Sequence, residues 1–147
     1  MVSSYHQCYN FSMIQTLLIF SEWPILLLRV VLGLIFLVHG LPKIKDLKTT
    51  WQNFEMMGFK PGILWGTMVA VVEFFGGLLL ISGLLTPIAA FLLAIEMAVA
   101  TAWKIRRGQK LAGGFELDLL LVVSLLAIAT LGGGIYSLDS YWRIILF

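Results

Sequence analysis

Four apolar runs, each long enough to cross a lipid bilayer as a helix, constrain this chain more than any other feature. They cover about residues 24–41, 63–84, 87–103 and 115–131. A membrane-crossing helix needs about 20 mostly apolar residues. Apolar residues make up 60% of the chain and charged residues 12%, whereas ordinary soluble domains contain about 45–50% and about 25%. The sequence therefore predicts an all-α membrane protein, folded as an antiparallel bundle of four transmembrane helices.

The residues between the runs divide the chain into a tail and one domain. Pro24 suits the first turn of the first helix, and three consecutive glycines end the fourth at residues 132–134. The link "SGLLTP" is short, so the second and third spans form an antiparallel hairpin. We expect residues 1–22 to form a tail, for which a position at the membrane interface is one option, and residues 23–147 to form one four-helix transmembrane domain.

The segment between the first two spans has a different pattern. In "IKDLKTTWQNFEMM" the apolar residues Ile44, Leu47, Trp51 and Phe54 recur at helical spacing, with polar residues between them. This pattern predicts a short amphipathic helix at the membrane interface. Packing at the membrane rim is a simpler role for it than specific binding.

Lysine and arginine set the orientation. The loops after the first and third spans hold nearly all of them, and the link between the second and third spans holds none. The positive-inside rule therefore places both loops in the cytoplasm and both termini outside. We expect a multi-pass protein of the bacterial inner membrane. The net charge of only +2 gives no reason to expect nucleic-acid binding.

Charges inside the spans are the main functional signal, because a charge at the centre of a membrane helix costs roughly 2.5–3.5 kcal/mol on insertion scales. Counted from the cytoplasmic helix ends, Glu73 lies about 15 Å deep and Arg29 about 18 Å deep. Both share helix faces with small residues that suit close helix packing. Those small residues are Gly33, Gly40, Gly66, Ala70 and Gly77. We therefore expect an Arg29–Glu73 ion pair, either as a structural clasp or as part of a ligand or proton site.

The third span carries a further carboxylate, Glu96, about 10 Å deep, with no cation obviously at its level. A stripe of alanines that includes Ala94 and Ala98 gives this span a second packing face. Polar residues near the cytoplasmic helix ends are expected to form a vestibule. They are His39, Lys104, Glu116 and Asp118. Because the candidate histidine and the carboxylates show no metal-ligand spacing, no metal site is predicted.

Four segments resemble the DoxX family of small four-span membrane proteins. They are "RVVLGLIFLVHGLPKI" at 29–44, "MMGFKPGILWG" at 56–66, "VEFFGGLLLISGLLTPIAA" at 72–90 and "GGGIYSLDSYW" at 132–142. One departure is Gly133, where the family often has proline. The resemblance implies an inner-membrane bundle and marks Lys43 and Asp139 as family-like, the latter as a turn or helix cap. Relatives are linked to thiosulfate–quinone oxidoreduction, thiol-stress complexes and methylamine utilisation, and distant eukaryotic ones to cargo export or receptor assembly.

Fold alone does not fix function, so three functions stay open. The first is a redox-associated membrane subunit that binds a quinone or similar amphipathic molecule, with a membrane or soluble redox partner. The second is a scaffold, assembly factor or cargo receptor without chemistry. The third is a small proton-coupled transporter using Glu73 and Glu96, for which a homodimer would supply the missing room. The candidate ligand-binding or ion-pairing residues are Arg29, His39, Lys43, Glu73, Glu96 and Asp118. The sequence does not decide whether the chain is an enzyme.

Overall fold

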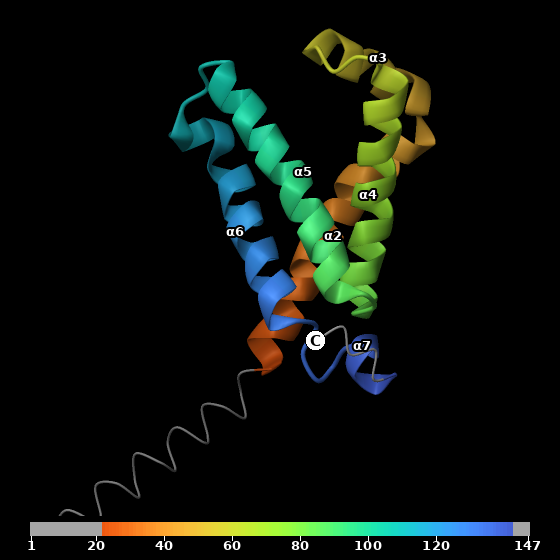
Figure 1. The fold of residues 1–147 in the computed structure, drawn as a ribbon, viewed down its shortest axis with the longest axis vertical. Helices are drawn as coiled ribbons and strands as arrows, with labels where there is room; N and C mark the ends of the chain where they lie inside the picture. Colours follow the sequence, from red (N-terminus) through yellow and green to blue (C-terminus); the bar gives the residue numbers. More distant parts are fainter. Residues whose placement is uncertain (1–21, 143–147) are drawn as a thin grey trace, which may run out of the picture.

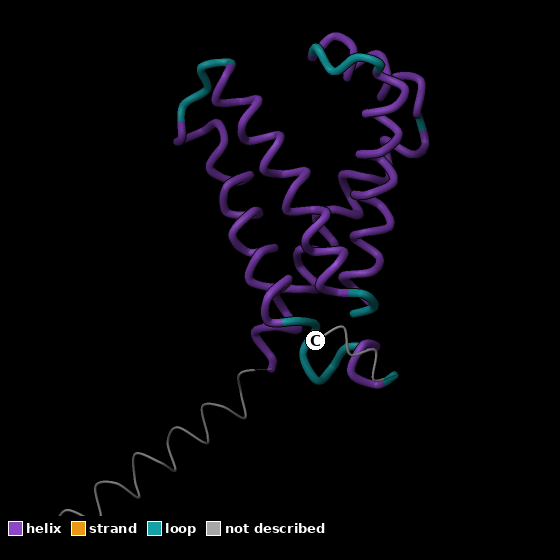
Figure 2. The backbone as a smooth tube through the Cα atoms, in the orientation of Figure 1, coloured by secondary structure: helices purple, strands orange, loops and turns teal. Residues whose placement is uncertain are grey.

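The computed structural model describes residues 22–142, and every element in that range is helical. Except for Glu22, the expected N-terminal tail lies outside the described residues. The elements are α2 (Glu22–Lys45), α3 (Leu47–Met57), α4 (Gly62–Ser82), α5 (Thr86–Arg106), η1 (Leu111–Phe115), α6 (Glu116–Leu131) and α7 (Leu138–Tyr141). Short connections join them at the two ends of the molecule (Figure 2).

The prediction of four membrane-spanning helices is confirmed. Four segments are long and apolar enough to cross a membrane: α2, α4, α5 and Leu111–Leu131. In the last of these, η1 leads into α6, and the backbone of η1 is kinked at Ala112 and Gly113. Large apolar side chains such as Leu27, Phe75 and Leu120 are exposed on their outer faces, which indicates a lipid environment. The short helix α3 lies between the first two spans, as the amphipathic pattern predicted.

The first helix differs from its predicted limits in a way that matters for the site. It continues past residue 41, through Pro42, to Lys45. Proline lacks a backbone N–H and disfavours a helix interior, which is why the sequence suggested an earlier end. Here Pro42 lies in the last turn, and the extra turn carries Lys43 on the helix.

The helices form two pairs, α2 with α4 and α5 with α6. Figure 1 shows that the pairs lie close together at the end where residues 132–142 fold back, and separate toward the other end, where α3 and the α5–α6 connection lie. We call the latter the basic end, because it carries the exposed cations. These are Lys45, Lys48, Lys60, Arg106, Arg107 and Lys110.

Glycines bring α2 and α4 into backbone contact. A Cβ placed on Gly33 would lie 2.7 Å from the Gly77 carbonyl oxygen, and one on Gly40 would lie 2.6 Å from the Phe74 amide nitrogen. These approaches leave no room for side chains, so α2 and α4 pack closely at Gly33, Gly40 and Gly77. Ala70 in the same interface is fully buried.

Two small residues behave differently from the prediction. Gly66 is buried against Trp51 of α3 instead of α2. On α5, Ala94 is 3% exposed in the core, whereas Ala98, expected on the same packing stripe, is exposed in this chain. Ala98 follows Ala94 along α5 in the direction of the basic end, toward which the two helix pairs separate (Figure 1).

Candidate functional site

An ion pair between α2 and α4 is the centre of the candidate site. The Lys43 Nζ atom lies 2.5 Å from Glu73 Oε2, and the two side chains are 31% and 5% exposed. Gly40 lies directly against the backbone of Glu73, and Lys43 lies one turn further along α2. The close approach at the glycine therefore brings the ammonium within reach of a carboxylate that is buried in an apolar helix.

Glu96 of α5 adds a third charged side chain. Its carboxyl group lies beside Glu73 and interacts electrostatically with both Glu73 and Lys43. One of its oxygens, Oε2, is fully buried and has no hydrogen-bond partner. Three helices thus bring one ammonium and two carboxyl groups together. We call Lys43, Glu73 and Glu96 the polar cluster.

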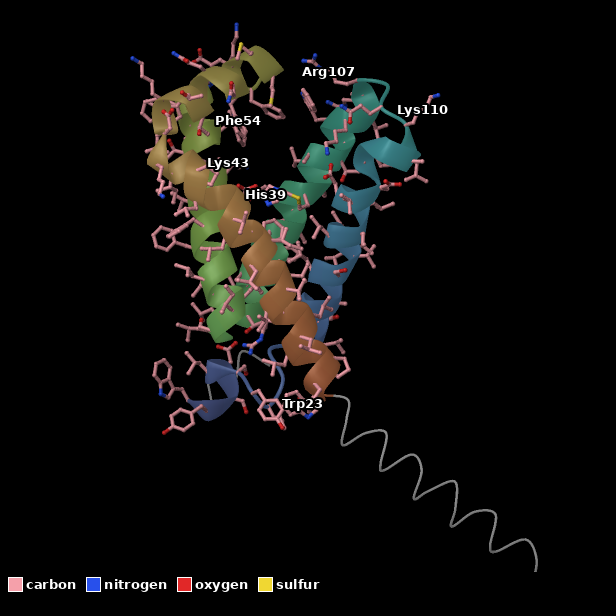
Figure 3. The ribbon with its side chains drawn as sticks, turned by 180° about the vertical axis from the view of Figure 1, so that it is seen from behind. Trp23, His39, Lys43, Phe54, Arg107 and Lys110 are labelled. Atoms are coloured by element: carbon pink, nitrogen blue, oxygen red, sulfur yellow. The ribbon has the colours of Figure 1, made fainter. Side chains whose placement is uncertain are left out.

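His39 lies on α2 one turn from Lys43, at the level where the helix pairs separate (Figure 3). Its Nδ1 atom is 2.7 Å from the Ile35 carbonyl oxygen of its own helix, and the residue is exposed. The imidazole therefore bonds back to its own helix through Nδ1.

A second ion pair joins α5 and α6 nearer the basic end. Lys104 Nζ lies 2.7 Å from Asp118 Oδ2, with the side chains 30% and 13% exposed. Glu116, also expected in the vestibule, is exposed. The expected vestibule residues therefore do not form one group: Lys104 pairs with Asp118, His39 bonds to its own helix, and Glu116 is exposed.

The expected Arg29–Glu73 pair is wrong. Arg29 is 1% exposed, and its Nη2 atom donates a hydrogen bond to the Tyr136 carbonyl oxygen at 3.1 Å. The antiparallel register explains the error. With Gly40 opposite Glu73, Arg29, eleven positions earlier on α2, meets the far end of α4, where its guanidinium lies against Gly83.

Asp139 binds two backbone amides at the end of the molecule where Arg29 lies, opposite the basic end. Its two carboxylate oxygens accept hydrogen bonds from the amides of Leu85 at 2.7 Å and Thr86 at 2.9 Å. These amides begin α5, whose own N-cap residue, Leu85, offers no side-chain cap. A residue more than 50 positions away therefore caps this helix, whereas the sequence suggested Asp139 only as a local turn or helix cap after the glycines.

Sequence reasoning missed one contact near the site. At the basic end, the Met57 carbonyl oxygen accepts hydrogen bonds from Trp103 Nε1 at 3.1 Å and Arg107 Nη2 at 3.3 Å. The Arg107 guanidinium also stacks over the Trp103 ring, 4.7 Å from its centroid. The acceptor is a main-chain group at a helix end, so no side-chain pattern marked it.

Comparisons with known proteins identify the family. The DoxX family model matches residues 25–105, a range that contains the whole polar cluster. "Putative oxidoreductase CatD" from Bacillus subtilis is 32% identical over 116 residues, which cover 79% of this chain and 84% of the relative. An "Uncharacterized protein" from Haemophilus influenzae is 32% identical over 118 residues, covering 77% and 86%. No solved structure matches the chain. With four apolar helices and these matches, the chain belongs to the DoxX family of membrane proteins.

Proposed function

We propose that this protein is a redox-associated membrane subunit that binds a quinone or a similar amphipathic small molecule at the polar cluster. The observation that carries the proposal is the convergence of Lys43, Glu73 and Glu96 from three helices inside an apolar bundle. Ionisable groups within membrane spans are costly and usually serve a function. The oxidoreductase name of the Bacillus relative favours redox chemistry over the alternatives.

The chemistry of the polar cluster suits a quinone ring. Reduction of a quinone to a quinol takes up two electrons and two protons at the ring oxygens. An ammonium such as that of Lys43 can donate a hydrogen bond to a ring carbonyl oxygen. A carboxyl group such as that of Glu96 can supply or accept a proton there, provided that it lies within hydrogen-bonding distance of the bound ring. The chain contains a single cysteine, so we assign the electrons to a partner protein and not to a dithiol of this chain.

The position of the cluster fits an amphipathic ligand. The basic end is proposed to face the cytoplasm of a bacterium, in keeping with the positive-inside rule. Glu73 is nearly fully buried, whereas the Lys43 side chain is 31% exposed, so the ammonium is the partly exposed end of this ion pair. A polar headgroup would meet the charged groups while an apolar tail stays among the apolar helix faces.

The test is quinone binding by the purified protein in lipid nanodiscs. A ligand that binds only the folded state at one hundred times its Kd stabilises it by about 2.7 kcal/mol. We expect a soluble ubiquinone or menaquinone analogue to raise the unfolding midpoint of the native protein. Glu96→Gln should reduce the rise, because it replaces one carboxyl group of the cluster at nearly constant volume.

Asp118→Asn is the matched control, since it changes a carboxylate outside the polar cluster. It should leave the quinone-dependent rise intact. Protein that carries no quinone after mild purification, and whose unfolding midpoint does not change with any analogue, would contradict the proposal.

A scaffold role is the second candidate, and the exposure of Ala98 favours it. A small exposed residue on a membrane helix allows another helix to approach closely in lipid. If a partner docks there, Ala98→Leu should abolish its stoichiometric co-purification without changing the stability of the bundle. Unchanged co-purification would exclude this face as the docking site.

A further inference from the structure

The described part of the molecule consists of two halves that are held together differently at their two ends. One half contains α2, α3 and α4, and the other contains α5, η1 and α6. Away from the basic end, the α4–α5 turn and residues 132–142 join the halves. The hydrogen bonds at this end include the one from Arg29 to the Tyr136 carbonyl oxygen and the one from the Leu85 amide to Asp139. At the basic end, the hydrogen bonds that join the halves within residues 22–142 both end on the Met57 carbonyl oxygen.

The helix that carries this carbonyl is fixed firmly to the first half only. A Cβ on Gly62 of α4 would lie 2.2 Å from the Trp51 carbonyl oxygen, so α3 and α4 touch through their backbones. The Trp51 ring also donates a hydrogen bond to Thr67 of α4 at 2.8 Å. By contrast, the hydrogen bonds from the end of α5 to α3 come from the side chains of Trp103 and of the C-cap residue of α5, Arg107. Figure 3 shows Arg107 reaching from the end of α5 toward α3.

The polar cluster lies behind this contact. Glu96 is on α5, and Trp103 and Arg107 follow it on the same helix at spacings of seven and eleven residues, which place all three on one face. Lys43 is near the end of α2, just before α3 begins. Along α5, the contact of Trp103 and Arg107 with Met57 therefore lies between the basic end and Glu96.

We propose that the contact of Trp103 and Arg107 with Met57 is a latch that governs access to the polar cluster from the basic end. With the latch closed, the ends of the two halves are held together over the cluster. With it open, the halves separate about their joined end, and an amphipathic molecule reaches Lys43 and Glu96. The ligand part of this proposal rests on the proposed function, whereas the opening of the latch does not.

The test measures accessibility without any ligand. Cys8, the single cysteine, is replaced by serine, and Ala100→Cys supplies a reporter. Ala100 is half-buried and lies one turn from Glu96 toward the latch. Its reaction rate with a membrane-impermeant maleimide is measured in lipid nanodiscs. Trp103→Phe then removes one donor and keeps an aromatic ring, and Arg107→Met removes the other donor.

We expect each latch variant to raise the labelling rate about fivefold, the effect of losing one ordinary hydrogen bond. Arg106→Met is the matched control, because Arg106 is an exposed cation on the same turn and has no part in the latch. It should leave the rate unchanged. Hydrogen exchange of the backbone amides of residues 54–59 should also accelerate in the two latch variants.

Equal labelling rates and equal exchange in the parent and in both latch variants would overturn the proposal, as would an equal increase in Arg106→Met. Neither measurement depends on quinone, so a result that refutes the latch can be distinguished from one that refutes the proposed function. If the latch and the proposed function are both correct, the latch variants should also speed the exchange of a bound quinone analogue by a similar factor.

Discussion

Removal of the lysine from the polar cluster tests the energetic description of the site most directly. In Lys43→Met the apolar stem remains, but Glu73 loses its ammonium partner while only 5% of its side chain is exposed. Breaking a buried ion pair by removing one partner typically costs 3–5 kcal/mol. Because the Lys43 side chain is 31% exposed and thus partly solvated, we expect the low end of that range, about 3 kcal/mol.

The assay is a double-mutant cycle on the free energy of unfolding in detergent micelles. Replacing both members of a buried pair by apolar residues of similar volume is often neutral or stabilising. Lys43→Met with Glu73→Met should therefore recover most of the loss caused by Lys43→Met alone. Lys45→Met, on the exposed neighbouring lysine, should stay within about 0.5 kcal/mol of the native protein. The reasoning would be refuted if Lys43→Met lost no more stability than Lys45→Met. It would also be refuted if the double variant with Glu73→Met were no more stable than Lys43→Met alone.

Three further predictions follow from the packing and the helix caps. Ala94→Leu should lower the unfolding free energy by about 1–3 kcal/mol through overpacking. Ala98→Leu, at an exposed position, should change it by less than about 0.5 kcal/mol. Equal effects of the two substitutions would contradict the separation of the helix pairs toward the basic end. Asp139→Ala should cost about 1–2 kcal/mol in chemical unfolding, as for other lost caps, and Asp139→Asn, which keeps one acceptor oxygen, should cost less. Hydrogen bonds from the Thr49 side chain and backbone lower the pKa of Asp46. Since the carboxylate is the capping form, amide protection in α3 should hold from pH 7 to about pH 5 and fall only below about pH 4, the ordinary aspartate value; loss of protection above pH 5 would contradict this.

The composition and the apolar runs were sufficient for the fold class. Length and hydropathy alone define the four spans, because a bilayer requires about 20 apolar residues per helix. The amphipathic period similarly identified α3, which the structure places over Leu47–Met57. These features are local, so they can be read from consecutive residues.

The candidate residues were found in the same way, because a charged residue within an apolar run can be recognised from its neighbours in the sequence. What the sequence could not supply was the partner of each charge. Glu73 was assigned to Arg29 by depth, yet the structure pairs it with Lys43 and places Arg29 against the C-terminal segment.

The physical reason is that pairing depends on register between helices. The backbone contacts at Gly33 and Gly40 fix that register, and a shift of one turn moves a side chain by about 5.4 Å, enough to exchange one partner for another. The sequence by itself thus determined that this chain spans a membrane as four helices and which charges it buries. Only the tertiary structure decided that Lys43, Glu73 and Glu96 meet, that Asp139 caps a distant helix, and that Met57 joins the two halves.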